Sequence, residues 1–167
     1  MTFEQEKNMN WEEACAAPSL LNLPYKIELN EWGTIMMSPV SLQHSNYATE
    51  IYDIFVEILE GGKALFEPGV ETSKGTRVPD VAWFTREHWQ ENKGNFSAST
   101  APMICVEVLS PSNAWGEMEE KKALFFAAGA EEVWVCGPDG KMRFFTTTGE
   151  VEKSEIAPEF PAEIILD

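Results

Sequence analysis

The sequence predicts a mixed α/β domain, in which helices flank a central sheet. The segment "PMICVEVLS", residues 102–110, is a continuous apolar run of the kind found in a central strand covered on both faces. A helical pattern and a second apolar strand follow it, and this strand–helix–strand order favours a parallel crossover. The chain has 167 residues, of which 44% are hydrophobic, enough for one domain with a sizeable core.

The N-terminal part predicts one short helix followed by two short strands. Residues 11–17 have a helical pattern and lead into a Pro-punctuated segment. Residues 25–39 predict two strands around a turn from Asn30 to Gly33, with Pro39 ending the second. We therefore expect residues 1–24 to form an N-terminal helical extension. Residues 25–167 should form a single domain, to which the first two strands add a hairpin.

The clearest amphipathic helix follows, in the segment "SLQHSNYATEIYDIFVEILEGG". Ser41 is the expected N-cap, with Asn and Ser alternatives close by, and two glycines end the helix. Its apolar positions recur at helical spacing: Tyr47, Ile51, Ile54, Phe55 and Ile58.

The remaining elements alternate between strands and helices. Short strands are expected in "KALFEPGV" and "RVPDVAWF", and a helix around "REHWQENKG". A longer helix in "AWGEMEEKKALFFAAG" should stop at Gly129. The segment "EEVWVCGPDGKMRFF" then predicts a hairpin around a Pro-Asp-Gly turn.

Composition limits the classes of function. The formal net charge is −16, from 12 basic and 28 acidic residues, which argues against non-specific nucleic-acid binding and favours the attraction of cations. No apolar run is long enough to span a membrane, and the N-terminus lacks the features of a signal peptide, so a cytoplasmic location is expected. Cys105 and Cys136 lie in apolar runs, which predicts buried free thiols.

Two acids lie inside apolar strands, where an ionised carboxylate is costly unless it is paired, hydrogen-bonded or bound to a metal. They are Asp80 in "VPDVAWF" and Glu107 in "PMICVEVLSPS". Lys121 lies on the apolar stripe of the next helix, from which it can reach back over the sheet. Two acids and a lysine suit a metal-dependent phosphodiesterase. They also suit a structural ion pair, which the residues alone favour without excluding the metal site.

Five motifs occur in an order that resembles the Uma-two family of restriction-endonuclease-like proteins, within the PD-(D/E)XK nuclease superfamily. They are an "MSP…H" entry, a "PD" strand, an "EVLSPS" strand, a "K…G" helix and a "VW" strand leading into a hairpin. The resemblance runs from about Tyr25 to the C-terminus. It implies a restriction-endonuclease-like fold and an endonuclease that hydrolyses DNA with Mg²⁺ or Mn²⁺.

The resemblance also implies roles for individual residues. Asp80 and Glu107 take the metal-binding positions, and Lys121 takes the catalytic lysine position, with Lys122 as its runner-up. The usual superfamily lysine, two residues after the glutamate, is replaced here by Leu109.

Two residues are candidate accessory groups, each with an ordinary alternative. Glu50 is either a further site acid or a solvated helix acid. His44 is either a site residue that contacts phosphate or metal, or a structural residue that caps the start of the helix.

The resemblance further implies a homodimer, by analogy with nucleases of this fold. The net charge and Leu109 support an alternative function, a weakly active or inactive nuclease-fold module that regulates or binds another protein.

Overall fold

A six-stranded mixed sheet forms the centre of the molecule, in the order β10-β9-β8-β7-β6-β3. The computed structural model describes residues 8–111, 113 and 115–167. The pair β7 and β8 is parallel and the other neighbouring pairs are antiparallel, which confirms the predicted mixed sheet and crossover. The strands are β3 (Lys63–Phe66), β6 (Val81–Phe84), β7 (Ile104–Val108), β8 (Glu132–Cys136), β9 (Met142–Thr146) and β10 (Gly149–Val151).

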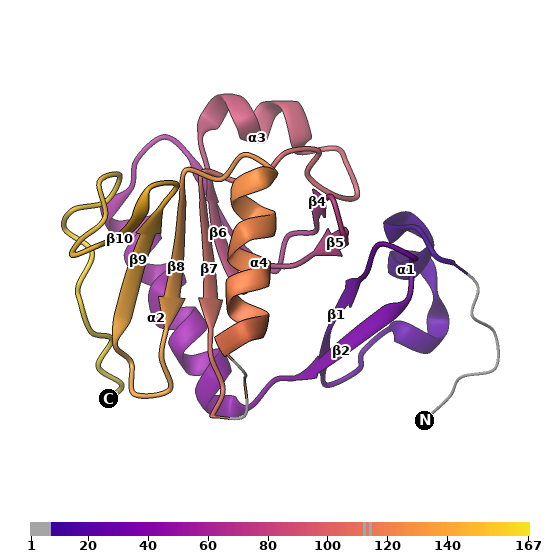
Figure 1. Cartoon of the computed structure of the whole chain (residues 1–167), viewed down its shortest axis with the longest axis horizontal. Coiled ribbons are helices and arrows are strands. Elements are labelled where there is room, and N and C mark those ends of the chain that lie inside the picture. Colours follow the sequence, from indigo (N-terminus) through magenta and orange to yellow (C-terminus); the bar gives the residue numbers. More distant parts are fainter. Residues whose placement is uncertain (1–7, 112, 114) are drawn as a thin grey trace.

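Two helices cover opposite faces of this sheet, α2 behind it and α4 in front of it in Figure 1. The described helices are α1 (Trp11–Ala16), α2 (Leu42–Ile58), α3 (Arg86–Asn92) and α4 (Trp115–Ala127), with a 3-10 turn at Pro18–Leu20. Ser41 caps α2 as predicted, since its side chain accepts a hydrogen bond from the His44 amide. None of the helices in the described ranges is long and apolar enough to cross a membrane.

The core follows the alternation of side chains along β7. All five residues of this strand are buried, as expected for a continuous apolar run. Ile104 and Val106 pack into the cluster that contains residues of α2, whereas Cys105 packs with Phe125 of α4. Because successive side chains point to opposite faces, Glu107 lies on the α4 face with Cys105.

The buried-thiol prediction is confirmed for two cysteines. Cys105 and Cys136 are free and buried, whereas Cys15 is free and exposed.

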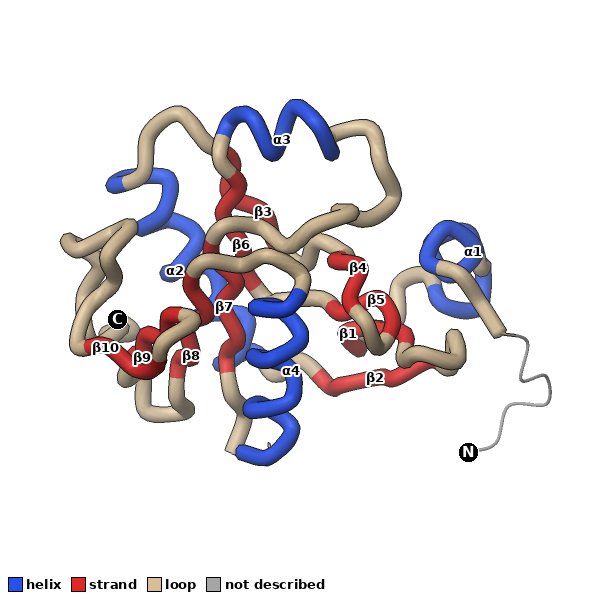
Figure 2. The backbone as a smooth tube through the Cα atoms, turned by 45° about the horizontal axis from the view of Figure 1, so that its top comes forward, coloured by secondary structure: helices blue, strands red, loops and turns tan. Residues whose placement is uncertain are grey.

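Two small hairpins lie beside the main sheet (Figure 2). The first pairs β1 (Tyr25–Leu29) with β2 (Ile35–Pro39) and confirms the predicted N-terminal hairpin. Its turn is closed by the Asn30 side chain, which accepts hydrogen bonds from two backbone amides, and by Gly33, whose φ is +74°.

The second hairpin was not predicted, and it corrects two of the expected strands. The strand expected in "KALFEPGV" ends at Phe66, because Glu67 has a φ of +48° and Pro68 lacks an amide donor. The chain then forms β4 (Val70–Thr72) and β5 (Gly75–Arg77). The expected strand "RVPDVAWF" is likewise divided at Val78–Asp80, between β5 and β6.

A buried carboxylate fastens the C-terminal segment to the sheet. Glu132 is 2% exposed and accepts hydrogen bonds from the Trp134 indole, the Ser154 hydroxyl and the amides of Glu155 and Ile156. Trp134 lies in the apolar run "VWVC", which is typical of a strand core residue, and it is fully buried.

Candidate active site

Asp80 and Glu107 lie side by side because the backbones of β6 and β7 hold them there. The Asp80 amide donates to the Val106 carbonyl at 2.9 Å, which places Asp80 beside β7 just before β6 begins. The Asp80 carboxylate in turn accepts a hydrogen bond from the Val108 amide at 2.7 Å. Both acids are buried, at 1% and 3% exposure. The two acids singled out in the sequence therefore meet at one place in the fold.

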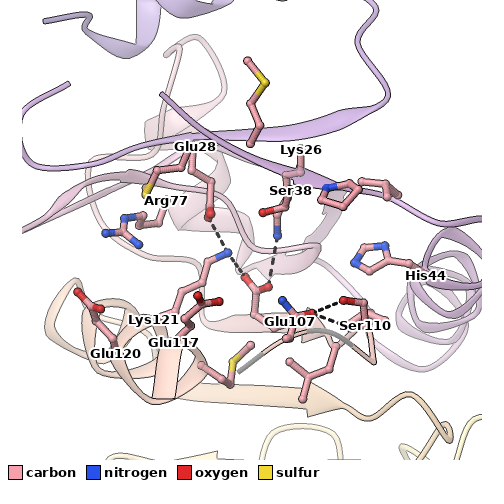
Figure 3. A pocket seen from close by; sticks show the side chains of 18 residues that line it. Lys26, Glu28, Ser38, His44, Arg77, Glu107, Ser110, Glu117, Glu120 and Lys121 are labelled. Atoms are coloured by element: carbon pink, nitrogen blue, oxygen red, sulfur yellow. Dashed lines mark hydrogen bonds and ion pairs between the residues drawn. The ribbon is translucent and has the colours of Figure 1, made fainter. Parts of the chain in front are cut away.

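Lys121 reaches the same place from α4, as Figure 3 shows. Its Nζ lies 2.7 Å from Glu107 Oε1 and 2.6 Å from Glu28 Oε1, and it donates to the Val78 carbonyl at 3.2 Å. Leu109, at the usual lysine position, instead packs against the small apolar cluster around Met118. The lysine that contacts Glu107 therefore comes from α4, because Leu109 occupies the usual lysine position after β7.

Two residues of β1 complete the cluster, and neither was predicted. Lys26 Nζ lies 2.8 Å from Asp80 Oδ1 and 3.3 Å from Glu107 Oε2, so its ammonium joins the two acids. Glu28 pairs with Lys121 and also accepts a hydrogen bond from the Val78 amide at 2.7 Å. Lys26 and Glu28 are two residues apart on a strand, so their side chains lie on the same face. This spacing is the only feature of the sequence that links the two residues.

Of the three accessory candidates, His44 lies in the cluster, whereas Lys122 and Glu50 lie outside it. His44, in the first turn of α2, places Nε2 3.2 Å from Asp80 Oδ2 and so belongs to the cluster. Lys122 points elsewhere, because it pairs with Glu119 and lies 3.9 Å from the centre of the Phe145 ring. Glu50 is neither an ion-pair partner in this cluster nor a lining residue of its cavity, as far as the described residues go.

A cavity of about 520 Å³ opens beside these side chains. Residues of β1, β2, α4 and the loop after β7 line it, together with His44 and Arg77. Ser110 is one of the lining residues, and its amide and hydroxyl both donate to the Asn113 side chain. The sequence allows Ser110 and Ser112 either to hydrogen-bond the site or to cap the following helix, and Ser112 lies outside the described residues. The cavity gives a small polar ligand access to Glu107 and Lys121.

The two central acids have opposite pKa shifts. Burial alone would raise the pKa of Asp80, but the charge of Lys26 and the hydrogen bond from His44 outweigh it and hold the pKa well below its usual range. Burial raises the pKa of Glu107 to about 7, although Lys121 and Lys26 oppose the shift. Asp80 is therefore ionised at neutral pH, whereas burial disfavours the ionised form of Glu107 and the nearby cations favour it. Shifted pKa values of this kind are common at functional sites.

Two basic residues of the cluster have raised pKa values. Burial disfavours the Lys26 ammonium, but Glu107, Asp80 and Glu28 outweigh burial and raise its pKa well above the ordinary value. The pKa of His44 is also raised, because the hydrogen bond and charge of Asp80 outweigh the effect of burial. The site thus combines three carboxylates with two ammonium groups and one imidazole.

The donor chemistry of the site fits a hard divalent cation. Mg²⁺ is usually held by one or two carboxylates and completes its shell with water and substrate oxygens. Asp80 and Glu107 supply such carboxylates, and Glu107 Oε1 is buried without a hydrogen bond from any described residue, although Lys121 lies close to it. Across the described part of the chain, no three His, Cys, Asp or Glu side chains are arranged as a complete set of protein ligands. A bound cation would therefore rest on two protein carboxylates and exogenous oxygens.

A mixed sheet flanked by helices, with two acids and a lysine meeting beside its central strands, has the features expected of a nuclease fold. A family model described as "Putative restriction endonuclease" matches residues 11–165. The chain belongs to this family, Uma2, and the expected resemblance is confirmed.

A solved structure supports the same fold. It is described as a "putative nuclease belonging to DUF820" from Anabaena variabilis ATCC 29413. The two chains are 17% identical, with a TM-score of 0.74, and the match covers 93% of this chain and 94% of the other. No curated protein matches the chain. The likeness to the solved structure confirms the expected nuclease fold.

Proposed function

We propose that the protein is a metal-dependent endonuclease that hydrolyses phosphodiester bonds of DNA. The observation that carries the proposal is the meeting of Asp80, Glu107 and Lys121 beside an open cavity. Family membership supports the same class of activity.

Each residue has a chemical task in this proposal. Asp80 and Glu107 would hold Mg²⁺ or Mn²⁺, which when bound polarises the phosphate and acidifies a water molecule. Lys121 faces the cavity and would orient the attacking water or stabilise the negative charge that develops on the phosphate. His44 hydrogen-bonds Asp80 and keeps that carboxylate ionised and oriented.

The two adjacent lysines of α4 provide a matched test of this assignment. Lys121→Met should lower the rate of plasmid cleavage with Mn²⁺ by roughly 100-fold, because the site loses the ammonium of α4 that contacts Glu107 and faces the cavity. Lys122→Met should change it by less than about 3-fold, because Lys122 lies over Phe145 instead. Supercoiled plasmid, single-stranded DNA and RNA should be assayed in parallel, with and without EDTA.

Circular dichroism should confirm that both variants are folded. Cleavage that survives EDTA, or equal loss in the two variants, would argue against the proposed role of Lys121. Cleavage of RNA but not DNA would mean that the substrate is RNA, while the roles assigned to Asp80, Glu107 and Lys121 would stand.

The second candidate function is a nuclease-fold module that binds or regulates another protein without catalysis. The favouring observation is that Lys26 and Lys121 already neutralise the site acids, in a chain with a net charge of −16. Such a module would be folded, bind no Mn²⁺ at the site and cut no nucleic acid. The expected homodimer stays a prediction, which light scattering on the purified protein would test.

A further inference from the structure

Lys26 occupies the space between the two acids that are proposed to bind the metal. Its Nζ is 2.8 Å from Asp80 and 3.3 Å from Glu107, and the side chain is only 7% exposed. In the described residues these two carboxylates are its only ion-pair partners. A divalent cation bound by the same oxygens would face this ammonium at short range, and charges of the same sign repel strongly in a buried setting.

The Lys26 ammonium and a divalent cation cannot both occupy the position between these carboxylate oxygens. The side chain must therefore move. A lysine has a long flexible stem, and Lys26 itself lines the adjoining cavity of about 520 Å³.

Lys26 also comes from a part of the fold that is separate from the main sheet. It lies on β1, which among the described strands pairs only with β2, whereas Asp80 and Glu107 are held by β6 and β7. Figure 3 shows Lys26 and Glu28 reaching the site from one side and Lys121 from the other. The ammonium can therefore leave the acids without disturbing the backbone that holds them.

We infer that the Lys26 ammonium competes with a divalent cation for the carboxylates of Asp80 and Glu107. In the metal-free protein the ammonium bridges the two acids, and it must move away when the cation binds. This inference rests on the proposed metal-dependent function. Lys26 then sets the metal affinity of the site. It also prevents repulsion between Asp80 and Glu107 when no metal is bound.

The inference is tested by direct measurement of Mn²⁺ binding, without any activity assay. Isothermal titration calorimetry should show that Lys26→Met binds Mn²⁺ at least 10-fold more tightly than the wild-type protein. Lys26→Arg, which keeps the positive charge, should remain close to wild type. Lys141→Met is the matched control, because Lys141 is exposed in the turn between β8 and β9 and should bind Mn²⁺ as wild type does.

Loss of Lys26 removes the cation that the two buried acids share, so a second measurement covers a loss of stability. Saturating Mn²⁺ should raise the melting temperature of Lys26→Met, or of the milder Lys26→Gln, by more than it raises that of the wild type.

Two other outcomes separate the inference from the proposed function. If wild type binds Mn²⁺ and folded Lys26→Met binds it equally or more weakly, the competition is refuted and the metal site stands. If neither protein binds Mn²⁺, the proposed metal-dependent function fails, and the inference fails with it.

Discussion

Replacing Asp80 by asparagine should lower Mn²⁺-dependent DNA cleavage by roughly 100-fold or more. The amide oxygen carries no charge, so it binds a divalent cation poorly. The substitution also removes the carboxylate that Lys26 and His44 contact. Because Lys26 and His44 hold Asp80 ionised against the effect of burial, its charge is the property that the site depends on. The initial rate of plasmid nicking, measured over a range of Mn²⁺ concentrations, would quantify the loss.

Asp53→Asn is the matched control for this substitution. Asp53 lies on α2 and is exposed, so the same chemical change should leave cleavage within about 3-fold of wild type. Equal activity of Asp80→Asn and wild type would indicate a contaminating nuclease or a different site. A loss in both variants would point to a general effect of reduced negative charge.

The largest expected effect on stability lies away from the site, at Glu132. Glu132→Ala should lower the free energy of unfolding by roughly 3 kcal/mol or more, because four donors lose their acceptor in the interior. Those donors include the Trp134 indole at 2.6 Å and the Ser154 hydroxyl at 2.6 Å. Urea unfolding followed by tryptophan fluorescence would measure the change.

The neighbouring Glu131 supplies the control for this prediction. Its side chain is exposed, so Glu131→Ala should change the free energy of unfolding by less than about 1 kcal/mol. A change of under 1 kcal/mol in Glu132→Ala itself would mean that water or a shifted C-terminal segment replaces the lost acceptor.

The sequence predicted the sheet and three members of the site because their signals are local. A continuous apolar strand that contains Glu107 and a Pro-fixed acid at Asp80 can be recognised without knowing the fold. Lys121 could be inferred because it interrupts the apolar stripe of α4 at helical spacing. The structure brings these three side chains together.

Lys26 and Glu28 could not be inferred in the same way. In an edge hairpin, a polar face normally faces water, and alternating Lys and Glu on a strand fit that ordinary pattern. Their burial depends on β1 lying over the site, which is a long-range consequence of how the hairpin packs beside β5 (Figure 2). The β4–β5 hairpin was missed because its strands are too short to show an alternating pattern.

The most direct test of the central claim is anomalous scattering from crystals soaked in Mn²⁺. We expect one strong peak beside the carboxylates of Asp80 and Glu107, with the Lys26 ammonium moved away from both. The claim would be contradicted if saturating Mn²⁺ gave no peak at these acids, with Lys26 still between them.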